Sequence, residues 1–191
     1  MIRIYRQLLF MSLFTGIILI ANAYSADTVL CFRLVHPDND RLSSLAKAQA
    51  KVDTQRYEYF ARETEGYWVD RKVELDIHDL RDVKIKVMVK EGGASQWGYI
   101  EVTPDTFPSF HFPSSSKPCL VDIYFTEKGR KKMTNVTAKN VGKKLAMVFR
   151  GKLLMEPPLI KEKINAEYVT VTRLSIDEAT LLRDAVRRSN E

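Results

Sequence analysis

The stretch from Leu120 to Arg173 constrains the fold most strongly. It opens with an apolar, β-rich run, and the residues that follow predict a helix that starts at Thr126 and presents one narrow apolar face. Gly142 is suited to a left-handed C-cap, so the helix should end just before it. We expect its apolar face to pack on a sheet.

A hairpin is predicted next. Two apolar runs, Leu145–Phe149 and Lys152–Met155, flank Arg150-Gly151, a two-residue turn with glycine where positive φ is needed. Pro157-Pro158 should stop the second strand, because proline cannot donate to a sheet ladder.

The C-terminal part adds one strand and one helix. Tyr168–Thr172 has strand character, and Ser175 with Glu178 forms a capping box that opens a helix through Val186. The order β-α-β-β-β-α predicts a compact C-terminal α+β unit. We expect the whole protein to be α+β, with a mixed or antiparallel sheet and helices on one face.

The upstream half carries further elements. Asp40 is placed to cap a following helix. The periodicity predicts that helix at Arg41–Val52, with strands at Thr28–Val35, Arg56–Phe60, Tyr67–Val69, Val83–Val89 and Trp97–Val102.

The N-terminus has the order of a secretory signal peptide. Arg3 and Arg6 precede an apolar run from Leu8 to Ala21, and small residues follow. We therefore predict a signal peptide at residues 1–26, a strand-helix-strand segment at 27–66 and an α+β domain at 67–191. The protein should be periplasmic or secreted; the alternative is an uncleaved N-terminal anchor in the inner membrane.

Several of these motifs also carry a family resemblance. In order along the chain they are Val121–Gly129, Asn135–Val148, the Arg150-Gly151 hairpin, Pro157–Ile160 and Leu174–Ala179. Together they resemble the periplasmic head subdomain of SecD/SecDF, the membrane-embedded accessory factor of bacterial protein export. The resemblance implies a fold that contacts polypeptide emerging on the far side of the membrane.

The charge is basic, with a formal net charge of +6. The excess gathers at Lys128–Lys132, Lys139–Lys144 and Arg183–Arg188. Such a face can hold an anionic membrane surface or acidic peptides; the alternative is a solvated helix face. We expect no nucleic-acid partner, because no motif supports one in an exported protein.

The two cysteines outside the signal segment are Cys31 and Cys119. In an oxidising compartment an even pair indicates a disulfide, which would tie the N-terminal strand to the strand at Leu120; the alternative is two buried or free thiols.

Motifs for catalysis are missing from the sequence. The three histidines, His36, His78 and His111, have no metal-ligand spacing, and no nucleophile elbow is present. Carboxylates between Asp70 and Asp82 are expected to form a solvated acidic face. We predict no enzyme activity, no cofactor and no small-molecule substrate.

The segment from Thr103 to Pro118 is rich in proline, serine and phenylalanine. Its aromatic side chains either tuck under the loop or are exposed as contacts. We predict a protein- or peptide-binding module that uses an exposed sheet edge, such as the one that Pro157-Pro158 terminates. The predicted contact residues are Phe107, Phe110, Phe112 and Lys152. The alternative is a dedicated inhibitor or immunity-type protein for one partner.

Overall fold

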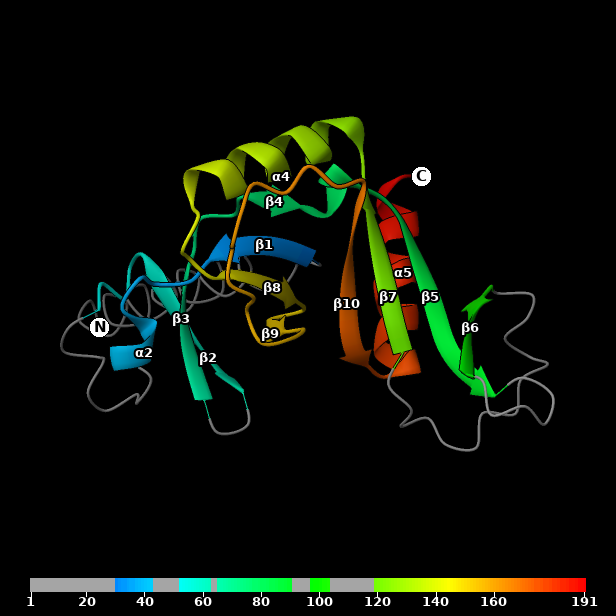
Figure 1. Cartoon of the computed structure of the whole chain (residues 1–191). Coiled ribbons are helices and arrows are strands. Elements are labelled where there is room, and N and C mark those ends of the chain that lie inside the picture. Colours follow the sequence, from blue (N-terminus) through cyan, green and yellow to red (C-terminus); the bar gives the residue numbers. More distant parts are fainter. Residues whose placement is uncertain (1–29, 43–51, 63–64, 91–96, 104–118) are drawn as a thin grey trace, which may run out of the picture.

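The structure, a computed structural model, describes residues 30–42, 52–62, 65–90, 97–103 and 119–191. It has the predicted α+β class (Figure 1). The elements in chain order are β1 (Leu30–Leu34), α2 (Asn39–Leu42), β2 (Tyr57–Arg62), β3 (Glu65–Asp70), β4 (Leu75–Asp76), the 3-10 helix η1 (Ile77–Asp79), β5 (Leu80–Lys90), β6 (Trp97–Val102), β7 (Cys119–Phe125), α4 (Glu127–Lys139), β8 (Leu145–Phe149), β9 (Lys152–Leu153), β10 (Tyr168–Leu174) and α5 (Ile176–Ser189).

The described strands form three antiparallel sheets. The main sheet has the order β10-β7-β5-β6, the second sheet has the order β4-β1-β8-β9, and β2 pairs with β3 as a hairpin. The predicted C-terminal order β-α-β-β-β-α is present, but its strands are divided between two sheets. Its hairpin β8–β9 belongs to the second sheet, whereas β7 and β10 pair with each other in the main sheet.

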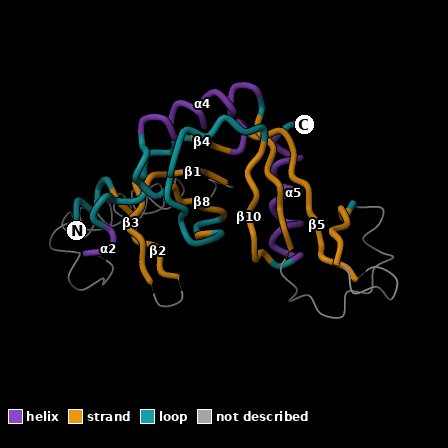
Figure 2. Tube along the Cα trace, in the orientation of Figure 1, coloured by secondary structure: helices purple, strands orange, loops and turns teal. Residues whose placement is uncertain are grey.

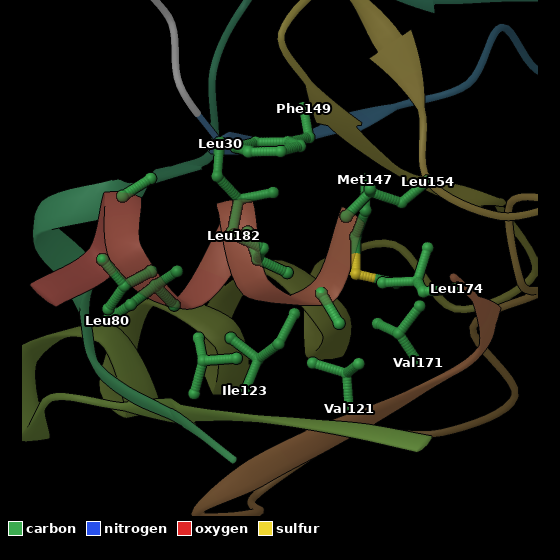
Figure 3. Packing of buried hydrophobic residues seen from close by; sticks show 14 of the residues in the cluster. Leu30, Leu80, Val121, Ile123, Met147, Phe149, Leu154, Val171, Leu174 and Leu182 are labelled. Carbon is green, nitrogen blue, oxygen red and sulfur yellow. The ribbon is translucent and has the colours of Figure 1, made fainter. Parts of the chain in front are cut away.

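Helix α5 lies between the two larger sheets and forms the main core with them. Figure 3 shows Leu182 on this helix, with Leu30 and Phe149 of the second sheet on one side and Val121 and Ile123 of the main sheet on the other. The predicted capping box is confirmed, because the Ser175 side chain accepts from the Glu178 N–H and the Glu178 carboxylate accepts from Ser175.

Helix α4 lies on the outside of the molecule, whereas α5 lies behind the strands of the main sheet (Figure 2). It starts as predicted, with Thr126 as the N-cap that accepts the N–H of Gly129 at 3.0 Å. Met133 is buried on its narrow inner face, and Gly142 follows the helix with φ +83°. Among the described helices, none is long and apolar enough to cross a membrane.

The β2–β3 hairpin covers the other face of the second sheet. Because side chains alternate along a strand, Leu30 and Phe32 of β1 enter the main core while Cys31 points to the hairpin side. There it joins a smaller cluster that includes Tyr67 and Val148. Strand β1 therefore belongs to the second sheet and pairs with β8, with Cys31 opposite Val148.

The N-terminal helix differs from the expectation. It begins at Asn39, so Asp40 lies in its first turn and is not the residue before it. The buried Asn39 side chain accepts the N–H of Trp68 at 2.8 Å and donates to the Gly66 carbonyl at 3.1 Å, which fixes the turn on β3. Residues 43–51 of the predicted helix, and the predicted signal segment, lie outside the described residues.

Candidate functional site

Strand β10 forms an edge of the main sheet. The N–H of Phe125 donates to the Glu167 carbonyl at 2.9 Å, which sets the alternation of the ladder with β7. In an antiparallel pair, every second residue turns its backbone groups away from the partner strand. These residues are Tyr168, Thr170 and Thr172; within the part of the chain that the structure describes, their outward N–H and C=O groups have no backbone partner. We call this row the β10 edge.

Side-chain contacts hold β10 in place. The Thr170 hydroxyl donates to Asp122 Oδ1 at 2.7 Å, and Lys86 Nζ lies 2.6 Å from Oδ2 of the same buried carboxylate. The Tyr168 ring packs against that of Tyr124 with centroids 5.0 Å apart. The outward backbone groups are thus presented by a strand whose position is already fixed, so pairing with another strand costs little ordering of the protein.

A β-bulge interrupts β10 near its end. The register shifts between Thr172 and Leu174, and Arg173 has φ +66°. A residue other than glycine pays about 1 kcal/mol for the left-handed region. The Arg173 side chain is exposed and makes no hydrogen bond or ion pair within the described residues.

A cleft of about 470 Å³ adjoins this bulge. One wall is formed by Thr172 and Arg173, and the segment 155–159 forms another. Backbone hydrogen bonds fix that segment to the start of β8, from Leu145 N to the Pro158 carbonyl at 3.0 Å and from Ile160 N to the Lys143 carbonyl at 2.8 Å. The lining residues are Arg62, Lys144, Met155, Glu156, Pro157, Pro158, Leu159, Thr172 and Arg173.

The charges that line the cleft are mostly positive. Three of its side chains are basic and one, Glu156, is acidic. Arg62 Nη1 donates to the Leu153 carbonyl at 3.2 Å, and Lys144 Nζ lies 3.1 Å from Asp40 Oδ1. Arg173 is therefore the basic group of the cleft that has no partner within the described residues.

Tyr67 lies beside the cleft and adds no charge to it. Lys144 Nζ lies 5.7 Å from the centre of the Tyr67 ring, and the Tyr67 hydroxyl donates to Glu65 Oε2 at 2.6 Å. Burial, followed by this hydrogen bond to Glu65, raises the pKa of Tyr67 above its usual range. The phenol is thus neutral at physiological pH.

The structure places one of the four predicted contact residues. Lys152 is exposed on β9 but does not line the cleft, and Phe107, Phe110 and Phe112 lie outside the described residues. The edge that Pro157-Pro158 was expected to terminate is short, because β9 has two residues. The carbonyl of one of them, Leu153, already accepts a hydrogen bond from Arg62. The longer open edge is β10, and no sequence signal pointed to Arg173.

The predicted disulfide is not formed in the structure. Cys31 and Cys119 are both free, buried thiols on different sheets, in accord with the alternative that the sequence left open. Cys31 faces the β2–β3 hairpin, whereas Cys119 belongs to the main core and donates from Sγ to the Leu174 carbonyl at 3.2 Å. Burial raises the pKa of Cys31 and raises that of Cys119 to about 11, which keeps both thiols protonated and unreactive.

The carboxylates between Asp70 and Asp82 do not form one solvated face. Asp70 and Asp79 are buried, and each has a basic partner: Arg56 Nε at 3.2 Å and Lys132 Nζ at 2.7 Å. In the described part of the chain, no three side chains of His, Cys, Asp or Glu gather as a metal site would require.

Comparison with known proteins agrees with the motifs. Residues 107–189 match the family model of the SecDF P1 head subdomain. This segment is therefore similar to the head subdomain of SecD/SecDF. The head-like segment contains both β10 and the 155–159 wall of the cleft. No curated protein matches the sequence.

Two solved SecDF structures are similar to the chain. The structure of the membrane component SecDF that enhances protein export has 21% sequence identity and a TM-score of 0.48, covering 85% of this chain and 63% of that chain. The crystal structure of SecDF in the super-membrane-facing form has 21% identity and a TM-score of 0.47, covering 85% of this chain and 19% of that chain. The chain therefore spans less than two thirds of these proteins.

Proposed function

We propose that this chain is an exported, non-enzymatic module that binds extended polypeptide, and that it acts in protein export or in the handling of envelope proteins. The observation that carries the proposal is the β10 edge, which offers outward backbone groups at Tyr168, Thr170 and Thr172 within the head-like segment. A peptide can add a strand to such an edge, gaining affinity from main-chain hydrogen bonds.

The cleft supports the same proposal. A strand added to β10 would run past Thr172 to the cleft between Arg173 and the 155–159 segment. Main-chain hydrogen bonds are available to any sequence without proline at the paired positions, so the edge suits many clients. The cleft then supplies a side-chain preference.

In-cell photo-crosslinking tests the proposal. A photo-reactive amino acid is placed at Thr172 on the edge, and the matched control carries it at Ala138, which is exposed on α4. We expect many unfolded or nascent envelope proteins to crosslink at Thr172 and few at Ala138. One dominant partner would favour a dedicated inhibitor or immunity-type protein, and equal capture at both positions would contradict the edge as the site.

The basic surface supports a secondary proposal, peripheral contact with an anionic membrane. Lys128 and Lys139 are exposed on α4 and have no acidic partner within the described residues. Several lysines near a surface of anionic lipid add to its attraction, and the effect is screened by salt. Flotation with vesicles that contain phosphatidylglycerol tests it; recovery that does not depend on this lipid would contradict it.

A further inference from the structure

We propose that the cleft beside the β10 bulge binds a carboxylate of the bound polypeptide, so that the module prefers extended segments that carry an acidic group where the added strand leaves Thr172. This inference rests on the proposed function, because it assigns a chemical preference to the same site. Arg173 is the residue that would hold the carboxylate.

The first argument is position. The outward backbone groups of β10 end at Thr172, and the next residue, Arg173, lies on the wall of the cleft. A peptide strand that pairs with Tyr168 and Thr170 and continues in the same direction therefore enters the cleft. The peptide residue that follows the paired part of the added strand therefore reaches Arg173, the basic residue of β10.

The second argument is charge. Arg62 and Lys144 already contact Leu153 and Asp40, but the guanidinium of Arg173 has no partner among the described residues. A guanidinium presents a planar fork of donors that matches a carboxylate in a bidentate pair. The side chains that line the cleft carry three positive charges against the one negative charge of Glu156, a balance that favours an anion.

The third argument is the backbone. Arginine at φ +66° adopts a conformation that favours glycine, and the side chain gains no contact in return within the described residues. Strain of this kind persists where it positions a group for function. A glycine would form the same bulge without strain, but it would remove the cation from the cleft wall.

Arg150 provides a matched control. It also has a left-handed backbone, with φ +49°, and its exposed side chain is at the β8–β9 turn, outside the residues that line the cleft. Arg173→Gly and Arg150→Gly each remove one positive charge and each place glycine where positive φ is required. Any difference between them in binding therefore reports on the cleft and not on net charge.

The test uses the purified chain and fluorescence anisotropy. The probes are three labelled ten-residue peptides of alternating threonine and valine. One has an internal Asp-Glu pair, one has Asn-Gln in its place, and the third has only uncharged side chains but a free C-terminal carboxylate. The first two are amidated at the C-terminus, so the set separates an acidic side chain from a chain terminus as the source of the carboxylate.

We expect the acidic peptide to bind about tenfold more tightly than its Asn-Gln counterpart at low salt, because a hydrogen-bonded charge contact is worth about that factor. Arg173→Gly should remove this preference, and Arg150→Gly should keep it. Circular dichroism of each variant confirms that it is folded. If only the third peptide binds more tightly than the Asn-Gln peptide, the cleft binds a C-terminal carboxylate and not an acidic side chain.

A further variant separates the two proposals. Thr172→Pro removes an outward N–H without removing a hydrogen bond to β7, so it should weaken all peptides alike. Equal binding of acidic and neutral peptides, lowered by Thr172→Pro, would overturn the carboxylate preference and leave the proposed function standing. Binding of no peptide would overturn both. Loss of preference in Arg150→Gly, or competition by phosphatidylglycerol vesicles that depends on Arg173, would also overturn a dedicated peptide-carboxylate site.

Discussion

The backbone carbonyl of Asp79 occupies the space that a side chain at position 129 would need, and Gly129 leaves that space open. A Cβ built on Gly129 would overlap the Asp79 oxygen. The same oxygen accepts the N–H of Thr126 at 2.9 Å and the Thr126 hydroxyl at 3.1 Å. The start of α4 is thereby locked onto η1, which leads into β5 of the main sheet.

We therefore predict that Gly129→Ala destabilises the protein. Alanine at a helical position ordinarily stabilises by up to about 1 kcal/mol. Here the overlap is with backbone, which cannot rotate away, so we expect a net loss of about 2 kcal/mol in the free energy of unfolding. Urea denaturation measures it, with Asn135→Ala at an exposed position of α4 as the control, expected to be neutral or slightly stabilising. A gain in stability for Gly129→Ala would show that the two backbones do not approach this closely.

Asp79 also carries a buried ion pair. Its carboxylate is 1% exposed and lies 2.7 Å from Lys132 Nζ. In Lys132→Met that carboxylate would still accept the Asp76 N–H but would have no cation beside it. We expect the free energy of unfolding to fall by about 2 kcal/mol. Lys131→Met is the control, since Lys131 pairs with Glu127 on the surface and should change stability by less than about 0.5 kcal/mol. Equal effects in thermal melts of the two variants would mean that the Asp79 pair contributes no more than a surface pair.

The elements that the sequence predicted correctly are those fixed by local signals. The capping box at Ser175, the cap at Thr126 and the positive φ at Gly142 and Gly151 each depend on residues a few positions apart. The same holds for β7, whose apolar run needs no distant information. Their positions in the structure confirm the element order of the C-terminal half.

Relations between distant residues were not accessible in this way. The pairing of Cys31 with Val148, and the separation of β8 from β7 into different sheets, depend on contacts across the whole chain. The same limit applies to the candidate site. The edge expected at Pro157-Pro158 is short. The open edge is at β10 because, among the described strands, β10 has a neighbour on one side alone, which is a property of the assembled sheet and not of the strand's own sequence.

The state of the two cysteines can be measured directly. Both thiols are buried, and the structure gives them no bond to each other. We expect Ellman's reagent to detect no thiol in the native protein at pH 8 and two thiols in guanidinium chloride, without prior reduction. Two thiols in the native state would contradict the burial. Detection of none after unfolding would show that the protein forms the disulfide, with a rearrangement of β1.

The raised pKa of Cys119 makes stability depend on pH in the alkaline range. The thiol has a pKa of about 11 when folded, against an ordinary value of 9.0. Between these values the unfolded chain loses its proton first, so the free energy of unfolding should fall as pH rises from 9 toward 11, by about 2 kcal/mol for this group. Below pH 9 the thiol is protonated in both states and has no effect.

The comparison for this prediction is Cys119→Ala. The variant should be less stable at every pH, because it leaves a small cavity in the main core, but its stability should fall less between pH 9 and 11. The measurement is urea denaturation under reducing conditions at pH 8, 9, 10 and 11. Parallel curves for the two proteins would assign the alkaline dependence to other groups, such as Cys31 and Tyr67, whose pKa values are also raised.

The left-handed backbone of Arg173 predicts an unusual order of stability for glycine and alanine at this position. In a regular strand, alanine is more stable than glycine by about 0.5 to 1 kcal/mol, because glycine loses more backbone freedom on folding. At φ +66° the order should reverse, since alanine keeps the strain of the left-handed region and glycine relieves it. We expect Arg173→Gly to be more stable than Arg173→Ala by about 1 kcal/mol, and Thr172→Gly to be less stable than Thr172→Ala. Thermal melts of the four variants measure this order. If alanine is more stable than glycine at both positions, Arg173 is in ordinary extended backbone. The bulge could then not be what directs the Arg173 guanidinium to the cleft.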